Sequence, residues 1–422
     1  MRGDGIARIS GVAIYVPFTA PGDRLRVRLA ERRGDGFAAE AVAWLARSAD
    51  RREPPCPAFG ACGGCAWQHL GGEIYARVKR DLLIEALGRQ RLRPEADFPV
   101  EPARISPPGD RRRVRFAGRR DGQGVVIGLR ERAGHAIVDL SQCPVAAPTI
   151  QALLAPCRAV AATLDVLRPA RRPAAFQVAA TLTDGGLDVT WTLPVVPGLP
   201  DRERLARFAD DRDLARVGWR LAADESRAGP AEPIAARRAA QVTFGATPVD
   251  LPPDAFLQAG RAGEAAIRDA VLDAVKQAPK GPVADLFAGC GTLSLPLAAS
   301  RAVHAVDGDS AAIAVLGAAA RRAALGRVST ELRDLMRRPL LASELARFAA
   351  VVFDPPSAGA QAQAQEIARS KLRTAVAVSC EPATLARDLR LLVDGGYAIE
   401  RVVPIDQFLW SPRVEAVAVL RR

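Results

Sequence analysis

The sequence lacks both the long apolar segment of a membrane-spanning chain and the apolar core of a secretory signal. None of its apolar stretches reaches the roughly 18 residues that a membrane helix needs, and no apolar core follows the first residues. These absences argue against a membrane partner and predict a cytoplasmic protein. The seven cysteines, an odd number without a signal, also do not indicate a disulfide framework in a reducing compartment.

What is present describes a large and basic chain. Its 422 residues, 49% of them hydrophobic and 25% charged, suffice for two or three domains with cores of their own. A net charge of +12 attracts polyanions, and nucleic acid is the commonest such partner. The alternative is a basic surface that is merely solvated.

The first half of the chain is rich in short strands. Residues 11–18, 24–30 and 36–45 alternate apolar and polar positions around the turn TAPGD, which predicts a small β-barrel over residues 1–50. A Pro- and Gly-rich cysteine segment and one amphipathic helix, with Ile74, Val78, Leu82 and Leu87 on one stripe, follow. Hairpins closed by ERAG and DGG then predict a β-rich central domain over residues 51–240.

The second half alternates strands with helices from residue 282 onward. Such alternation is typical of a doubly wound, mainly parallel sheet, so a Rossmann-like α/β domain is predicted over residues 241–422. The last strand, VEAVAVL, follows a loop that is too short for a crossover helix. We therefore expect it to run antiparallel.

A ligand pocket is predicted at the carboxyl ends of these strands. In DLFAGCGTLSLPLA, glycines 289 and 291 come between a strand and a helix, where the backbone can approach a ligand closely. Asp307 ends the next strand, where a carboxylate can accept hydrogen bonds from ribose hydroxyls. The third glycine of a pyrophosphate-binding loop is missing, because Ser294 stands after GCGTL. Asp334 and Asp354 follow the third and fourth strands.

The cysteines of the central domain form a candidate metal site. Cys56, Cys62 and Cys65 lie in a turn-rich segment, and Cys143 in SQCPV would be a fourth ligand from across the domain. Four thiolates suit Zn²⁺ or a [4Fe–4S] cluster, and the division into three plus one favours iron. The spacing differs from the Cys-x3-Cys-x2-Cys motif of radical enzymes. We therefore expect a structural or RNA-positioning cluster.

These motifs, in this order, carry a family resemblance over almost the whole chain. DLFAGCGT, Asp307, Asp334 and FDPP resemble the S-adenosylmethionine-dependent class I methyltransferases. SCEPATLARDL followed by VEAVAVL is similar to the RNA 5-methyluridine methyltransferase family. The segments CPAFGACGGCAWQHL and GDGIA with VPFTAPGD match the subgroup that has an OB-like TRAM barrel and an iron–sulfur cluster and acts on large-subunit ribosomal RNA.

The resemblance implies a specific chemistry. Carbon 5 of uracil becomes nucleophilic when a thiolate adds to carbon 6, which assigns Cys380 as the nucleophile. Glu415 is implied as the base that removes the carbon-5 proton. The target uridine must be single-stranded or flipped out. The resemblance places these residues around S-adenosylmethionine and the target base: Gln258, Phe287, Thr292, Asp307, Asp334 and Asp354.

Three positions depart from the family pattern. Glu381 replaces the usual Asn after the nucleophile, Ser357 an Arg after DPP, and Arg413 a His before the VE of the base. A carboxylate beside a thiol opposes thiolate formation, and Arg413 would offset Glu381 if the two approach. In addition, RRRVRF at 111–116 places arginines on both faces of a strand, which predicts an exposed, phosphate-binding edge.

The expected function is therefore a monomeric enzyme that makes 5-methyluridine in ribosomal RNA. A transfer RNA uridine-C5 methyltransferase is the nearest alternative. A cytosine-5 enzyme would place a cysteine after proline in the fourth-strand motif, and an amino-group enzyme an aromatic after DPP; DPPSAGA has neither. A non-catalytic RNA-binding or ribosome-assembly factor would explain the three departures but not the retention of Cys380 with Glu415.

Overall fold

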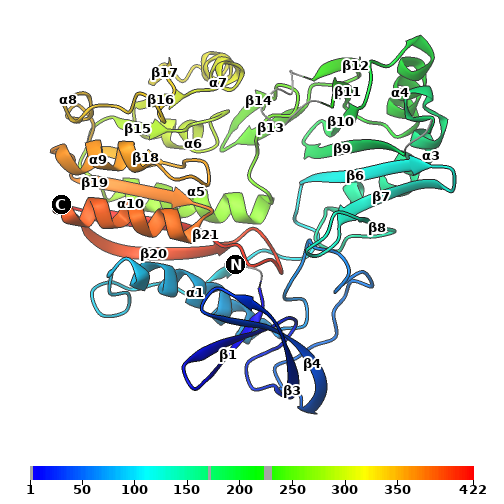
Figure 1. Cartoon of the computed structure of the whole chain (residues 1–422). Helices are drawn as coiled ribbons and strands as arrows, with labels where there is room; N and C mark the ends of the chain where they lie inside the picture. The colour runs from blue at the N-terminus through cyan, green and yellow to red at the C-terminus, as the bar shows by residue number, and fades with distance from the viewer. Residues whose placement is uncertain (1–2, 170–172, 223–230) are drawn as a thin grey trace.

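The computed structural model describes residues 3–169, 173–222 and 231–422. In these residues the strands form three sheets of four, seven and eight strands and one separate hairpin (Figure 1). The four-stranded sheet lies at the bottom of the view, the seven-stranded sheet at the right and the eight-stranded sheet at the left. No helix in this part of the chain is long and apolar enough to cross a membrane.

The N-terminal sheet has the strand order β1-β2-β4-β3. Its strands are β1 (Gly5–Ile9), β2 (Val12–Val16), β3 (Arg24–Arg33) and β4 (Gly36–Ala46). The three predicted strands are present, and β1 adds a fourth. Strands β2 and β4 run parallel, and a Cβ at Gly36 would lie 1.8 Å from the Ala13 carbonyl oxygen, so only glycine allows this pairing. Strands β1 and β3 are the edges of the sheet, so these pairings do not establish the predicted closed barrel.

The seven-stranded sheet has the order β12-β11-β10-β9-β6-β7-β8. Its strands are β6 (Arg113–Asp121), β7 (Gly124–Arg130), β8 (Ile137–Asp139), β9 (Ala174–Thr183), β10 (Gly186–Leu193), β11 (Arg216–Leu221) and β12 (Glu232–Ala236). Its helices are α2 (Pro148–Gln151), α3 (Leu154–Thr163), the 3-10 turn η1 (Asp165–Leu167) and α4 (Leu199–Asp211). The two predicted hairpins, β7–β8 and β9–β10, are confirmed. Apolar residues of both sheet and helices form one core around Trp191.

The eight-stranded sheet has the order β17-β16-β15-β18-β19-β21-β20-β5. Its strands are β5 (Arg104–Ile105), β15 (Val283–Leu286), β16 (Val303–Asp307), β17 (Val328–Leu332), β18 (Ala350–Phe353), β19 (Thr374–Ser379), β20 (Ala398–Asp406) and β21 (Glu415–Arg421). The pairs among β15 to β19 are parallel, while β21 runs antiparallel to β19 and β20. The expectations of a doubly wound sheet and of an antiparallel last strand are thus confirmed.

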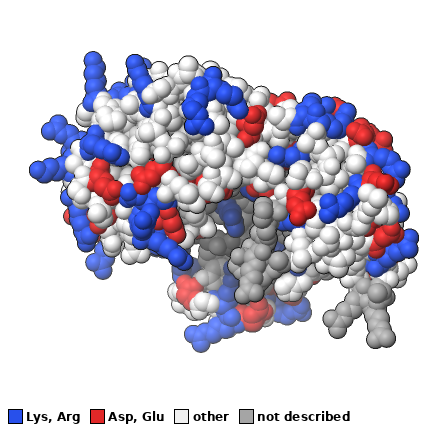
Figure 2. Space-filling view, turned by 90° about the horizontal axis from the view of Figure 1, so that it is seen from above, with Lys and Arg blue, Asp and Glu red and all other residues white. Residues whose placement is uncertain are grey.

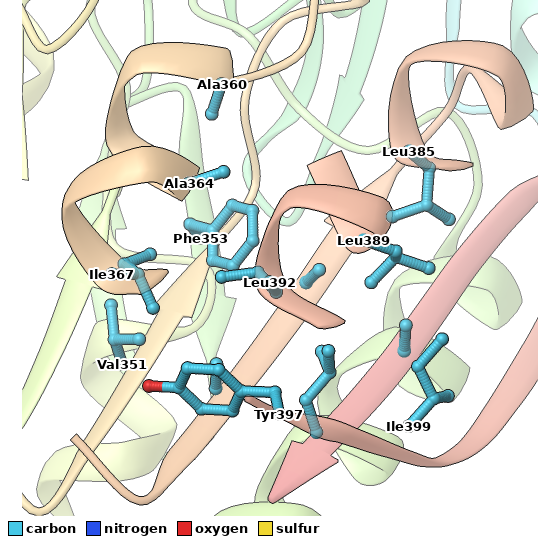
Figure 3. Close-up of a cluster of buried hydrophobic side chains, with 14 of the residues drawn as sticks. Val351, Phe353, Ala360, Ala364, Ile367, Leu385, Leu389, Leu392, Tyr397 and Ile399 are labelled. Atoms are coloured by element: carbon cyan, nitrogen blue, oxygen red, sulfur yellow. The ribbon is translucent and has the colours of Figure 1, made fainter. Parts of the chain in front are cut away.

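Helices cover both faces of this sheet. They are α5 (Arg261–Lys276), α6 (Ser294–Ala298), α7 (Ser310–Arg322), α8 (Ala342–Leu345), α9 (Gln361–Arg369) and α10 (Pro382–Asp394), and the hairpin β13 (Gln241–Phe244) and β14 (Thr247–Asp250) precedes them. Helices α9 and α10 bury Ala364, Ile367, Leu385 and Leu389 against the sheet (Figure 3). Helix α5 packs on the opposite face.

Helix α1 (Gly72–Arg89) joins this C-terminal core, although its sequence lies within the predicted central domain. Its Leu83, Ala86 and Leu87 belong to the same apolar cluster as α9 and α10. Strand β5 likewise extends the eight-stranded sheet beside β20. The segment from about 72 to 105 therefore connects the cysteine segment directly to the sheet whose strand ends carry the predicted pocket.

Lysine and arginine side chains are spread over the face of the molecule seen in Figure 2, with acidic residues between them. The surface therefore has no purely acidic region in this view. Such a distribution agrees with the net charge of +12 and with a polyanionic partner.

Candidate active site

The glycine loop after β15 is built for a close backbone turn. Phe287, Gly289 and Gly291 have φ values of +63°, +53° and +97°, in the left-handed region that favours glycine. The Gly289 N–H donates to Asp307 Oδ2 at 2.8 Å, and the Asp309 N–H donates to Asp307 Oδ1 at 2.8 Å. These two bonds hold the Asp307 carboxylate at the end of β16, beside the loop.

Asp334 lies near Asp307 at the next strand end. The Arg333 N–H donates to the Asp307 carbonyl at 2.9 Å, and the Asp334 carboxylate caps the following turn by accepting from the Met336 N–H at 3.0 Å. Asp334 is exposed, whereas Phe287 and Thr292 are half-buried. The structure thus brings four predicted cofactor residues, Phe287, Thr292, Asp307 and Asp334, to the carboxyl ends of adjacent strands and the loop between them.

Asp285 is a buried acid of this region that sequence reasoning missed. It lies in β15 and accepts a hydrogen bond from the Ser294 hydroxyl, which ties the strand to the end of the glycine loop. Burial, with smaller effects of Asp354 and Asp307, raises its pKa to about 7. The signal was an isolated acid within the apolar run VADLF.

A chain of buried amides joins the two remaining predicted carboxylates. Gln258 Nε2 donates to Asp354 Oδ2 at 2.9 Å, Gln407 Nε2 donates to Gln258 Oε1 at 2.7 Å, and Gln407 Nε2 also bonds Glu415 Oε2. Burial and the charge of Asp354 raise the pKa of Glu415 well above its usual value, and burial raises that of Asp354 to about 7. Glu415 Oε1 is buried without a hydrogen-bond partner. Gln407 was not predicted, because its role depends on β20 lying beside β21.

Cys380 follows the last residue of β19. Ser379 pairs with Ala416 across the antiparallel ladder. The next pair in this register is Cys380 with Glu415, at the carboxyl end of β19 and the start of β21. Burial, followed by the charges of Glu415 and Asp354, raises the pKa of the Cys380 thiol to about 11, while Arg413 lowers it. Cys380, Arg413 and residues of α1 line a cavity of about 420 Å³.

The structure corrects the expectation for Glu381. Its carboxylate accepts a hydrogen bond from the Ala383 N–H at 3.4 Å and so caps α10. The carboxylates with the largest effect on the thiol are Glu415 and Asp354, and Arg413 offsets these rather than Glu381. Ser357 is exposed, and its carbonyl accepts from the Thr384 hydroxyl at 3.1 Å.

Arg413 should therefore favour ionisation of the thiol, against the larger opposing effects of burial, Glu415 and Asp354. Below a pKa of about 11 the thiolate fraction rises about tenfold per pH unit, so the attack of Cys380 should accelerate with pH. Arg413→Gln should slow this attack severalfold at each pH, because the thiol loses a stabilising charge. The measurement is the rate of covalent adduct formation with 5-fluorouridine RNA against pH. Glu381→Asn is the control; an equal effect of both changes would contradict the assignment.

RRRVRF is not the exposed edge that was predicted. It leads into β6, an interior strand between β9 and β7. Arg112 is buried, pairs with Glu264 of α5 and donates from Nε to the Gln258 carbonyl at 3.3 Å. Arg113 and Arg115 approach Asp254 at 3.9 and 3.4 Å. The segment thus supports the loop that carries Gln258, and loss of one partner of such a buried pair costs roughly 3–5 kcal/mol.

The four predicted cysteine ligands line one cavity of about 290 Å³. They are Cys56, Cys62, Cys65 and Cys143, and the walls between them include Leu129, Leu140 and Phe408. All seven cysteines are free thiols. Burial raises the pKa of Cys62 and Cys143, and that of Cys65 to about 12. Within the described residues, no three His, Cys, Asp or Glu side chains converge closely enough to hold one metal ion.

The remaining thiols lie elsewhere. Cys157 is buried in the core of the seven-stranded sheet, and Cys290, within the glycine loop, is buried against apolar residues of the β13–β14 hairpin and α7. His69 is buried, and its Nε2 lies 3.2 Å from the Thr19 carbonyl oxygen.

A doubly wound sheet with a glycine loop, an acid at the second strand end and a thiol beside a buried carboxyl defines a methyltransferase-like enzyme. The fold agrees with a solved structure, the tRNA (uracil-54, C5)-methyltransferase of Pyrococcus abyssi in complex with S-adenosyl-L-homocysteine. The two share a TM-score of 0.75 at 22% sequence identity, over 100% of this chain and 98% of that one.

Sequence comparison identifies the family. The family profile described as tRNA (Uracil-5-)-methyltransferase matches residues 251–422. An uncharacterized RNA methyltransferase of Brucella melitensis is 43% identical over 100% of this chain and 95% of its own length. The 23S rRNA (uracil(1939)-C(5))-methyltransferase RlmD of Halomonas elongata is 33% identical over 99% of this chain and 87% of its own. The chain belongs to the RNA 5-methyluridine methyltransferase family, and it is an enzyme that methylates uracil C5 in RNA.

Proposed function

We propose that this enzyme transfers the methyl group of S-adenosylmethionine to carbon 5 of one uridine in large-subunit ribosomal RNA. The observation that carries the proposal is the proximity of a thiol, Cys380 after β19, and a buried carboxyl, Glu415 at the start of the neighbouring strand β21. The bound S-adenosyl-L-homocysteine of the Pyrococcus abyssi enzyme supports the choice of cofactor. The name of the Halomonas elongata relative supports the choice of RNA.

The residues present fit S-adenosylmethionine, which would supply an electrophilic methyl on a sulfonium. The left-handed glycines let the backbone approach the ligand, and Asp307 offers fixed oxygens to ribose hydroxyls. Asp334 is exposed at the next strand end, where an adenine amino group can be bound. Phe287 and Thr292 would complete the loop wall, and Gln258 and Asp354, which are hydrogen-bonded to each other, would face the target base.

In the proposed reaction, the Cys380 thiolate forms a bond to carbon 6 of uracil, and the electron pair of the C5–C6 double bond moves to give an enolate. Carbon 5 then forms a bond to the methyl group, whose bond to the sulfonium sulfur breaks with its electron pair left on sulfur, so that S-adenosylhomocysteine leaves. Glu415 accepts the proton from carbon 5, the C5–C6 double bond re-forms, and the Cys380–C6 bond breaks to regenerate the thiolate. The unpaired Oε1 of Glu415 is the oxygen free to take that proton, since Oε2 is bonded by Gln407. Its raised pKa makes the ionised carboxylate a stronger base.

Transfer of labelled methyl groups tests this proposal. Purified enzyme and methyl-labelled S-adenosylmethionine are incubated with unmodified ribosomal RNA and, in parallel, with unmodified transfer RNA. We expect label as 5-methyluridine at one position of the large ribosomal RNA. Labelling of transfer RNA alone would favour the alternative substrate, whose support is the name of the family profile. Absence of label in both would refute the proposal.

We further propose that Cys56, Cys62, Cys65 and Cys143 hold a [4Fe–4S] cluster. Four thiols around one cavity of about 290 Å³ with apolar walls suit a cluster that takes four cysteine ligands. A single zinc ion needs sulfur atoms at about 2.3 Å from one point. The cluster would fix the cysteine segment beside the RNA, and residues 1–50 would serve as a TRAM-like RNA-binding module in front of it.

Iron analysis tests the cluster. Protein purified without oxygen should contain about four irons per chain together with acid-labile sulfide and visible absorbance. Cys56→Ser should lose most of the iron. Cys157→Ser, which changes a thiol buried in the core of the seven-stranded sheet, should retain it. Equal iron in both variants, or zinc in place of iron, would contradict the assignment.

A further inference from the structure

The 407–414 loop, which joins β20 to β21, lies between the two cavities described above. Phe408 and Leu409 line the cysteine cavity, Pro412 and Arg413 line the cavity beside Cys380, and Ser411 lines both. The loop begins at Gln407, which bonds Glu415, and ends at the strand that Glu415 starts. Its conformation therefore determines where three groups around the reacting base lie.

A buried lysine from helix α1 holds both halves of this loop. The Lys79 side chain is fully buried, and its Nζ lies 2.7 Å from Asp406 Oδ1. It also donates to the Phe408 carbonyl at 3.2 Å and to the Arg413 carbonyl. An ammonium group has three donors, so two of them are used within this loop and the third at Asp406, the residue just before it. The carbonyls of Phe408 and Arg413, near the two ends of the loop, are thereby held to one point.

Neighbouring residues hold the middle of the loop. The Tyr75 hydroxyl, one turn before Lys79, donates to Asp406 Oδ2 and accepts from the Trp410 N–H at 2.6 Å. The Trp410 carbonyl accepts from the N–H groups of Ala66 and Trp67 at 2.7 and 3.0 Å. Trp410 has a φ of +60°, a conformation that a bulky residue keeps only when its surroundings impose it.

The composition of this cluster argues for a role beyond stability. A buried ion pair gains little over well-packed apolar residues of the same volume, because both charges must leave water. Lys79 also lies 5.7 Å and 5.5 Å from the ring centres of Trp67 and Tyr75, so its surroundings are otherwise apolar. A charge in such a place is more useful for fixing polar backbone groups in one geometry than for adding to the core.

We propose that Lys79 is a positioning residue, which holds the 407–414 loop so that Gln407, Glu415 and Arg413 keep the arrangement that methyl transfer requires. This rests on the proposed function, because it assigns a purpose to groups around the target base. Lys79 touches neither base nor cofactor and acts only through the loop.

Lys79→Met removes the ammonium while keeping the length of the side chain. We expect kcat on ribosomal RNA to fall on the order of 100-fold, as for small displacements of reacting groups, with KM for RNA within about threefold. Tyr75→Phe, which keeps the shape of the ring, should give a smaller fall in kcat. Because Tyr75→Phe leaves the ion pair intact, it remains informative if Lys79→Met does not fold.

Arg216→Met is the matched control. Arg216 pairs with the buried Asp188 at 2.7 Å within the seven-stranded sheet and donates to the Leu251 carbonyl, and among the described residues it makes no hydrogen bond to the 407–414 loop. This variant should lose stability but keep the kcat of its folded fraction. If kcat per folded molecule is unchanged in Lys79→Met and Tyr75→Phe, Lys79 is only structural and the proposal is wrong.

Hydrogen exchange gives a readout that does not depend on activity. The amides of Ala66, Trp67 and Trp410 should exchange faster in Lys79→Met and in Tyr75→Phe than in the wild type, and no faster in Arg216→Met. If the wild type methylates no RNA, the proposed function fails, while faster exchange still shows that Lys79 holds the loop. Unchanged exchange in both α1 variants would overturn the proposal whatever the activity.

Discussion

Cys380→Ala should abolish methyl transfer, with a fall in turnover on the order of 10⁴-fold or more, as for loss of a covalent nucleophile. The reason is that carbon 5 of uracil is not nucleophilic until sulfur has added to carbon 6. Glu415 and Asp354, the carboxyls whose charges act on this thiol, are hydrogen-bonded to amides and cannot replace sulfur as the nucleophile. Binding of RNA should change little, because the thiol contributes a small part of the contact surface.

The measurement is a covalent adduct with ribosomal RNA that contains 5-fluorouridine, in which the carbon-5 fluorine cannot be removed as a proton. The wild type should form the adduct in the presence of S-adenosylmethionine, and Cys380→Ala should not. Cys157→Ala is the matched control, because Cys157 is a thiol buried in the core of the seven-stranded sheet. An adduct in Cys380→Ala, or its loss in Cys157→Ala, would contradict the assignment of Cys380 as the nucleophile.

Glu415→Gln should stop the reaction after the methyl group has been transferred. Carbon 5 would then carry both the methyl and its proton, and without a base the Cys380–C6 bond cannot break. We expect turnover to fall by about 10²–10⁴-fold and methylated RNA to accumulate in covalent linkage to the enzyme. Gel electrophoresis under denaturing conditions with ordinary ribosomal RNA detects this species. If free 5-methyluridine RNA appears at the wild-type rate, Glu415 is not the base.

The same change should not lower the stability of the fold. The pKa of Glu415 is raised, so the folded protein binds its proton more tightly than the unfolded chain does. Stability from this group is complete below the unfolded pKa and is lost as pH rises toward the folded pKa. A neutral glutamine avoids that loss and can still meet Gln407. At neutral pH the melting temperature of Glu415→Gln should equal or exceed that of the wild type, and a lower value would contradict the raised pKa.

The sequence predicted the parts of this site that depend on local strand patterns, but not the contacts between residues far apart in the chain. Cys380 stands in the motif SCEPATLARDL, directly after β19, and Glu415 stands at the start of the predicted last strand VEAVAVL, where β21 begins. Both follow from strand periodicity, which is local. The catalytic roles of these residues, and those of the cofactor and cysteine residues, remain predictions for the experiments above.

The errors have the opposite origin. RRRVRF was expected to be an exposed edge because its arginines occupy both faces of a strand, yet Arg112 finds Glu264 and the Gln258 carbonyl from another part of the chain. Glu381 was expected to act on its neighbour Cys380, but its carboxylate turns to cap α10. Glu381 is the next residue after Cys380, but the carboxylates that act on this thiol are Glu415 and Asp354, at the ends of other strands.

The sequence by itself determined the alternation of strands and helices after residue 282, the antiparallel final strand, the glycine loop and the strand ends at which Asp307, Asp354 and Cys380 lie, because the periodicity of apolar residues fixes each element and its faces. Only the tertiary structure decided which polar groups are buried together. Lys79 and Asp406 are 327 positions apart and Gln407 meets Gln258 across 149, so neither contact leaves a local pattern. A buried charge or amide needs a partner, and which partner it meets depends on how the elements pack.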